Sequence, residues 1–565
     1  MSMERRTCSG PARAGAAAGL AAALLAACGG SGTDVGGADP TASKGQVAVT
    51  PAYKVSYYAA SRFAEQASFG PTPALVTEIR TKGFEKWIDE QFALPASRVD
   101  PTPFQSFIDP TPNADWQRYQ RAFPDLAIAA PDQLRLRVTW ALSQYIVVSD
   151  RKGDLVGVLY WINLLQQHGL GRYDELLYQV SVNPMMGQYL DNNQNRPKSE
   201  ECPFCAPNEN YARELMQLFS LGVFKLNPDG TPIKDERGRL LETYTQRDVE
   251  ELARVLTGWQ HDPSPPNRPN RNWANWSRPM VPSTWPPERD SGAKIVLGKS
   301  FPAAQNQEKD LRDAIAMLMA HPNIAPFVAT RLIQHLVRSD PSPAYVLRVA
   351  NVFRNNGRGV AGDLKAVVKA VLLDAEARAA DTLGAQATGV GKFREPFLYQ
   401  TALWRGLGCT KLPGNQWGPV MSGSQRPFNA ESVFSFYAPQ DRAPGSNLLA
   451  PEQRLLTPVD IRDRLSLPEW PSEWRAATNS RSYENYAAAG CKLDEWRAAF
   501  ARSPLAFNDL LSARFFRGAM PPTLRSNIEQ MMRETWPPWN RDDPSEGALR
   551  MTGFALATPY FGVSK

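Results

Sequence analysis

Carboxylates, amides and an arginine are concentrated between residues 189 and 222, the densest polar region of the sequence. Asp191 follows one helical pattern, whereas Glu209, Arg213 and Glu214 lie at the start of the next. A carboxylate can act as a general acid or base, and a neighbouring guanidinium can hold an anionic group of a substrate. We therefore take Asp191, Glu209, Arg213 and Glu214 as candidate catalytic residues.

Helical spacing places some of these side chains together. Asn210, Arg213, Glu214 and Gln217 are separated by three or four residues and share one polar helix face. Residues expected to contact a polar ligand near this face are Asn195, Asn208, Asn210, Asp248 and Trp259. A structural interpretation also fits, in which Asn208 caps the helix and Arg213 joins a buried network of carboxylates. The sequence leaves both interpretations open.

The elements that position this region are predicted to be helices. Apolar residues recur at helical spacing in most of the chain, and no run of alternating strands is visible. The predicted helices cover residues 72–92 (broken at Gly83), 133–148, 161–165, 173–180, 211–221, 245–256, 307–319, 324–338, 343–355, 362–378, 394–406, 458–465, 491–501, 505–514 and 521–534. The predicted fold is all-α, a large multi-helix body with long proline-rich loops and at most a minor β-hairpin near 222–244.

A single large helical domain is expected over residues 53–565. The segment 260–305 is rich in proline and tryptophan, and a loop of this length is typical of a domain junction or a functional loop. Its alternating arginine, tryptophan and asparagine residues would also suit a platform for nucleic acid or sugar. Proline-braced packing over a helical core is the simpler interpretation.

The N-terminus has the pattern of an export signal. Basic residues precede an apolar run that ends Leu25-Ala26-Ala27-Cys28, and this run is too short to span a bilayer as a helix. This ending resembles a lipobox, which predicts a signal peptide over 1–27, lipidation of Cys28 and a flexible tether over 28–52. An uncleaved anchor or an ordinary cleavage site are the alternatives. The residue after Cys28 is Gly29 rather than Asp, and by the usual sorting pattern of Gram-negative lipoproteins this favours the outer membrane.

Four further cysteines remain after Cys28. Cys202 and Cys205 are three residues apart, which suits a local disulfide, a redox pair or half of a metal site. Export permits disulfides, so Cys409 and Cys491 are expected to form a second bridge. A c-type haem site needs a histidine directly after the second cysteine, and Ala206 stands there, so such a site is excluded.

Composition excludes several other functions. The 565 residues carry 63 Lys and Arg against 57 Asp and Glu, without a basic arm, and no nucleic-acid partner is expected. Only four histidines occur, at 168, 261, 321 and 335, and none forms a pair suited to zinc. We therefore predict neither a metal nor another cofactor.

Several segments resemble a known family. NENYARELMQLFSLGV at 208–223 and YTQRDVEELARVLTGW at 244–259 are similar to the bacterial domain-of-unknown-function family numbered eighteen-hundred. The resemblance extends to 61–92, YLDNNQNR at 189–196, SVFSFYAPQDRAPGS at 432–446 and the C-terminus. It covers essentially the whole mature chain.

The resemblance implies an exported, mostly helical protein, often encoded beside an exported sulfatase-like protein. It implies no settled activity. Many relatives carry histidines in the helix that corresponds to 140–148, where this chain reads WALSQYIVV, and this departure argues against a metal enzyme.

Two functions follow as hypotheses. The first is an enzyme that acts on an extracytoplasmic polar substrate, which requires carboxylates in an open site with a perturbed pKa. The second is a non-catalytic lipoprotein that binds or escorts a partner, such as the sulfatase-like protein. It requires buried, paired charges and an exposed apolar surface elsewhere.

Overall fold

A computed structural model of the chain describes residues 53–102, 112–264, 275–384, 391–415, 418–419, 425–466, 486–535 and 544–564. The predicted signal peptide at 1–27, the lipidation site Cys28 and the tether at 28–52 lie outside these residues. Within the described ranges, no helix is both long enough and apolar enough to cross a bilayer.

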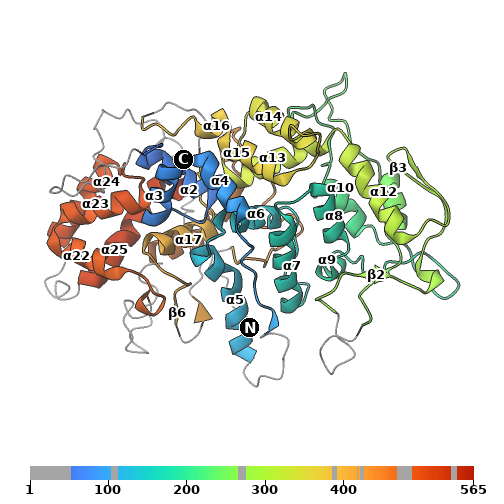
Figure 1. Cartoon of the computed structure of the whole chain (residues 1–565), viewed down its shortest axis with the longest axis horizontal. Coiled ribbons are helices and arrows are strands. Elements are labelled where there is room, and N and C mark those ends of the chain that lie inside the picture. Colours follow the sequence, from blue (N-terminus) through green and yellow to red (C-terminus); the bar gives the residue numbers. More distant parts are fainter. Residues whose placement is uncertain are drawn as a thin grey trace, which may run out of the picture.

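The chain folds as a sequence of short helices (Figure 1). The first helices are α2 (Tyr57–Ala67), α3 (Pro73–Lys82), α4 (Phe84–Ala93), α5 (Pro112–Ala129), α6 (Gln133–Ser143), α7 (Leu155–His168), α8 (Tyr173–Ser181), α9 (Pro184–Tyr189), α10 (Asn210–Gln217) and α11 (Gln246–Val255). The middle of the chain holds α12 (Gln307–Ala320), α13 (Ile324–Leu336), α14 (Pro343–Arg354), α15 (Leu364–Leu373), α16 (Ala375–Arg378) and α17 (Pro396–Gly406). The last group is α18 (Pro458–Ser466), α22 (Leu493–Arg502), α23 (Pro504–Phe515), α24 (Pro522–Gln530), α25 (Pro544–Leu556) and α26 (Pro559–Gly562). Single turns are η3 (Pro286–Glu288), η4 (Pro451–Leu455) and η5 (Met531–Thr535).

The described strands form two-stranded antiparallel pairs only. These are β1 (Trp259–Gln260) with β2 (Val281–Pro282), β3 (Lys294–Val296) with β4 (Lys299–Phe301), β5 (Lys392–Phe393) with β8 (Val563–Ser564), and β6 (Gly414–Asn415) with β7 (Gly418–Pro419). The expected hairpin at 222–244 is a meander of isolated bridges, such as Phe224 with Glu242. The all-α prediction with minor β structure is therefore confirmed.

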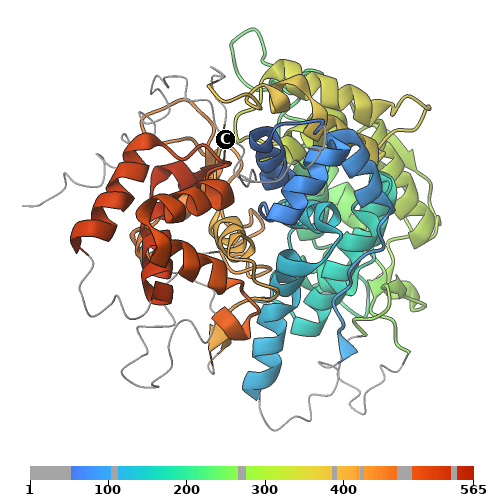
Figure 2. The same cartoon turned by 60° about the vertical axis from the view of Figure 1, so that its left-hand side comes forward.

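Two clusters of buried apolar side chains form the interior. The first extends from α2 to α15 and includes Phe63 and Trp140, and the second, around Trp404 and Trp496, holds the C-terminal helices. Helix α17 joins them, because its Phe397 belongs to the first cluster and its Trp404 to the second. Figure 2 shows the red helices α22–α25 beside the golden α17, with the blue and cyan helices on its other side.

The segment 260–305 holds the short pairs β1–β2 and β3–β4, with residues 265–274 outside the description. Strand β3 packs on α11, whose predicted capping box is present: Thr245 accepts from the Asp248 amide, and the Asp248 carboxylate accepts from the Thr245 amide. Helix α10 packs against α11 as well. A domain boundary at 260–305 stays a prediction.

Candidate functional site

Asp191 joins three segments at the start of α10. Its backbone is left-handed, with φ of 57°, which directs the chain out of α9. Its carboxylate accepts from Lys152 Nζ at 2.8 Å and from Asn210 Nδ2 at 2.7 Å. All three side chains reach solvent, so a charged carboxylate, an ammonium group and an amide stand together at the surface.

A second polar group lies one turn further along α10. Arg213 donates to Glu209 Oε2 at 2.6 Å and to Gln246 Oε1 at 3.1 Å, and Gln246 Nε2 donates to Glu209 Oε2 at 2.8 Å. The Arg213 and Glu209 side chains are 38% and 33% exposed. The expected network is therefore present but lies at the surface, where an ion pair contributes little to stability.

Glu214 has a different environment from its neighbours. It is 9% exposed, and its Oε2 is buried without a hydrogen-bond partner among the described residues. Burial raises the pKa of Glu214 to about 7, although the nearby Arg213 charge opposes the shift. A carboxyl of this kind can both hold and release a proton near neutral pH.

Two tyrosines lie close to Glu214, one from α9 and one from the loop before α11. Burial raises the pKa of Tyr189 to about 12, and the charge of Glu214 adds to the shift. Burial and Glu214 act in the same way on Tyr244, whose pKa also rises to about 12. Both phenols therefore remain protonated at neutral pH and can act as hydrogen-bond donors.

The amphipathic pattern of α10 explains why these groups meet. Tyr211, Ala212, Leu215 and Met216 are buried in the first core cluster, and this fixes the opposite face toward solvent. Glu214 is buried as well, although its position belongs to the polar face that holds Arg213.

The beginning of α10 differs from the sequence prediction. Asn208 was expected to cap the helix, but the helix begins at Asn210 and Glu209 occupies the N-cap position. The Glu209 side chain makes no capping hydrogen bond because it is engaged by Arg213 and Gln246. The expected capping by Asn208 is present in part, because its Oδ1 accepts from the amide of the first helical residue, Asn210, at 2.9 Å.

Asn195 is buried and holds the loop before α10 in place through hydrogen bonds. Its Oδ1 accepts from the Asn208 amide at 2.7 Å, and its Nδ2 donates to the Ala253 carbonyl at 3.3 Å. Its own carbonyl accepts from the Gly258 amide at 2.9 Å. These bonds hold the loop before α10 against the end of α11, and a direct contact of Asn195 with a ligand stays a prediction.

Asp248 and Trp259 also have structural partners. Besides its capping bonds, Asp248 accepts from the Leu297 amide at 2.8 Å. The Trp259 side chain is buried in the first core cluster, and its carbonyl accepts from the Gln194 amide at 2.8 Å. Of the predicted ligand contacts, Asn210 is the exposed one, and it lies directly beside Asp191.

Both predicted disulfides, Cys202–Cys205 and Cys409–Cys491, are present. The first closes a short loop that leads into α10, and Phe204 inside this loop is 99% exposed. A metal site at these cysteines would require reduction of the bridges, whereas a redox-active pair also has a disulfide state, so the bridge does not distinguish it from a structural one. No group of three or more His, Cys, Asp or Glu side chains in the described ranges could hold a metal ion.

Sequence inspection did not identify Lys152, Gln246, Tyr189 and Tyr244 as parts of this site. Lys152 is 39 residues from Asp191 along the chain, and Gln246 is 37 residues from Glu209, so no local spacing links these pairs. The family motifs at 189–196 and 244–259 contain Tyr189, Tyr244 and Gln246, and this is the signal that could have identified them.

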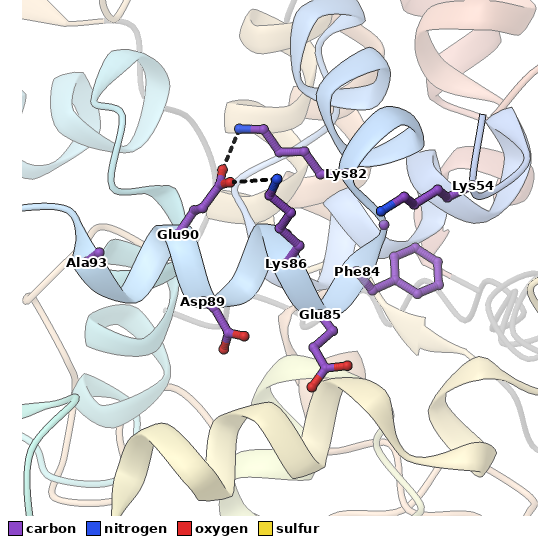
Figure 3. A pocket seen from close by; sticks show the side chains of 9 residues that line it. Lys54, Lys82, Phe84, Glu85, Lys86, Asp89, Glu90 and Ala93 are labelled. Atoms are coloured by element: carbon purple, nitrogen blue, oxygen red, sulfur yellow. Dashed lines mark ion pairs between the residues drawn. The ribbon is translucent and has the colours of Figure 1, made fainter. Parts of the chain in front are cut away.

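A surface hollow of about 670 Å³ lies elsewhere, at the α3–α4 corner (Figure 3). Several of its charged side chains form ion pairs with one another or with a neighbouring helix. Lys82 contacts Glu90 at 2.5 Å, and Lys369 of α15 contacts Asp89 at 2.8 Å. These pairs are exposed to solvent, so they contribute little to stability.

Comparison with known proteins gives one family. A family model described as a protein of unknown function (DUF1800) matches residues 62–563, and neither curated proteins nor solved structures yield a match. The match includes the whole polar region around α10. The chain therefore belongs to the DUF1800 family of proteins of unknown function.

Proposed function

We propose that this protein is an exported lipoprotein with an enzymatic site on the polar face of α10. Glu214 carries the exchangeable proton, and the surrounding side chains bind a polar extracytoplasmic substrate. The observation that carries the proposal is the buried Glu214 carboxyl, whose pKa is raised to about 7 beside a solvent-exposed polar surface.

The neighbouring groups suit a substrate with both anionic and hydroxyl groups. Lys152 and Arg213 are half-exposed cations held by one carboxylate each, and a bound anion could share them. Asp191 and Glu209 offer acceptors for substrate hydroxyl or amine protons. Glu214 would take a proton from the substrate when ionised and return it when protonated.

The site stands near the surface rather than in a deep cavity, which favours a polymer or a large polar molecule over a small enclosed metabolite. The N-terminal Leu25-Ala26-Ala27-Cys28 supports the location. Lipidation of Cys28 and the tether would hold the body close to a membrane, most simply the outer membrane, facing the periplasm or the cell surface.

A substrate screen tests the enzymatic part. Purified mature protein is incubated with peptidoglycan fragments, acidic oligosaccharides and peptides, and products are identified by mass spectrometry. For any converted compound, Glu214→Gln should lower turnover about 100-fold or more and abolish an inflection of the pH–rate profile near 7. Glu78→Gln, in an exposed pair on α3, is the matched control. Unchanged turnover in Glu214→Gln would contradict the proposal.

An escort function is the second candidate, and Phe204 favours it. Phe204 is 99% exposed and lies in a loop that a disulfide closes. Exposed apolar side chains held in this way can form part of a surface that a partner protein covers. The exported sulfatase-like protein often encoded beside relatives of this chain is the partner we propose. Calorimetry with the two purified proteins tests this candidate, and Phe204→Ser should weaken any complex.

A further inference from the structure

The two disulfides have different surroundings. Cys409 is 7% exposed and belongs to the second core cluster, and Cys491 packs against that cluster. Cys202 and Cys205 are both partly exposed, and neither belongs to a core cluster in the described part of the chain. A disulfide is opened by a thiolate that attacks one of its sulfur atoms, so exposure decides which bridge can react in the folded protein.

The exposed bridge contributes little to holding the fold together. Its cysteines are three residues apart, and a disulfide that closes so short a loop limits the freedom of the unfolded chain least. The hydrogen bonds around it are local: the Cys202 amide donates to Ser199 Oγ at 3.1 Å, and the Cys205 amide donates to the Cys202 carbonyl at 3.1 Å. The loop is anchored to the body just beyond the bridge, where the Asn208 amide donates to Asn195 Oδ1 at 2.7 Å. Opening the bridge therefore leaves this anchor of α10 in place.

The residues next to the cysteines give the bridge a surface that a protein can recognise. Phe204, between the two cysteines, is 99% exposed. An apolar ring beside an exposed bridge offers a contact that a partner protein can cover, whereas a small thiol compound is too small to do so. Glu200 and Glu201 directly precede Cys202 and are exposed, and their charges repel an anionic thiol such as glutathione. These features favour a protein as the reductant.

We propose that Cys202–Cys205 is a thiol–disulfide exchange site whose reductant is an exported protein with a reduced Cys-x-x-Cys pair. This activity is separate from the proposed acid–base chemistry at Glu214 and does not depend on it. A thiolate of the partner attacks one sulfur of the bridge, the Cys202–Cys205 bond breaks, and the released sulfur takes up a proton. The partner's second thiolate then attacks the mixed disulfide between the two proteins, which frees the other cysteine as a thiol. Two electrons and two protons pass to this chain, and the partner is left with a disulfide.

Reduction of the folded protein tests the reactivity of the bridge. The full mature chain is treated with dithiothreitol at neutral pH without denaturant, free thiols are alkylated, and the modified residues are located by peptide mass spectrometry. We expect alkylation of Cys202 and Cys205 with Cys409–Cys491 still intact, because the second bridge packs in the core. Resistance of Cys202–Cys205 until urea is added, or reduction of both bridges at the same rate, would overturn the proposal.

Reduced thioredoxin, a small protein with a Cys-x-x-Cys dithiol, is the probe for a protein reductant. It should reduce Cys202–Cys205 about 10-fold faster or more than dithiothreitol does at the same dithiol concentration. Phe204→Ser should lower the thioredoxin rate about 10-fold and leave the dithiothreitol rate within about twofold, because only the protein probe covers the ring.

A second exposed apolar residue provides the matched control. Leu505 on α23 is 60% exposed, and Leu505→Ser should change neither rate. A thioredoxin rate no faster than the dithiothreitol rate would overturn the proposal. A thioredoxin rate that is the same in the wild type and in Phe204→Ser would overturn it as well.

Discussion

Arg213 and Glu214 are neighbours on α10, yet their side chains have opposite environments. Arg213 forms a 2.6 Å ion pair with Glu209 at the surface, whereas the Oε2 atom of Glu214 is buried without a hydrogen-bond partner in the described ranges. Both residues belong to the polar face of α10, so the elements that pack around this helix, rather than its own periodicity, separate the solvated cation from the desolvated acid. The proposed site depends on this arrangement.

The buried carboxyl predicts a pH-dependent stability. The pKa of Glu214 is about 7 in the folded protein and near 4.5 in the unfolded chain. Between these values the unfolded chain releases a proton that the folded protein keeps, so the free energy of unfolding falls as pH rises. We expect the wild type to lose about 2 kcal/mol more than Glu214→Gln across this range, allowing for partial solvation. Urea denaturation at several pH values measures the difference, and parallel curves would contradict the assignment.

The variant Arg213→Ala distinguishes a role of Arg213 in substrate binding from a role in the stability of the fold. Its ion pair with Glu209 is half-exposed, so the substitution should cost less than about 1 kcal/mol. A loss of about 3–5 kcal/mol would instead indicate a buried pair and a structural role. If the α10 face binds an anionic substrate, the same variant should bind it more weakly with an almost unchanged Tm.

The two disulfides should differ in their contribution to stability. Cys409–Cys491 closes a loop of 82 residues, whereas Cys202–Cys205 spans three, and a longer loop constrains the unfolded chain more. Replacing both cysteines of the long loop by serine should cost about 3–4 kcal/mol, and the short loop about half of that or less. Urea denaturation of the two double variants measures the difference. Thiol counting on the denatured, unreduced mature protein checks that both bridges form, and two or more reactive thiols would refute this.

Phe204 can be changed without harm to the fold. Its ring is almost entirely in solvent, so Phe204→Ser should leave Tm within about 1 °C of the wild type. A lower Tm would mean that the ring packs against the protein after all. An unchanged Tm with a weaker sulfatase-like complex would favour the escort function.

The proposed lipidation of Cys28 can be tested at the mature N-terminus. Mass spectrometry of the membrane-extracted protein should find Cys28 as the first residue, carrying acyl chains, and Cys28→Ser should release the protein from the membrane. An intact first residue or an unmodified Cys28 would contradict the anchor.

Local sequence signals predicted much of the helical architecture. The Thr245–Asp248 capping box and the glycine break at Gly83 both appear where their patterns placed them. The predicted helix at 362–378 is instead two helices, because the Asp374 side chain caps a new helix by accepting from the Glu376 amide. Capping bonds of this kind compete with helix continuation and are hard to weigh from the sequence.

Burial of individual polar side chains could not be predicted in the same way. Glu214 and Arg213 are equivalent in a helical pattern, and their different exposure depends on the elements that pack around α10. Tyr189 of α9 and Tyr244 of the loop before α11 lie near Glu214. Arg137 lies in a predicted amphipathic helix without any distinguishing neighbour, and only tertiary packing places it beside β5 and β8. Packing between distant segments of the chain therefore determines how far Glu214 and Arg137 are buried.

Proton occupancy at Glu214 is the quantity to measure first. Carbon-13 NMR of protein labelled at glutamate carboxyl carbons, compared between the wild type and Glu214→Gln, isolates the titration of this residue. We predict a midpoint near pH 7, with the carboxyl half-protonated where the proposed acid–base chemistry would operate. A midpoint near 4.5, the value of an ordinary glutamate, would contradict the proposed role of Glu214.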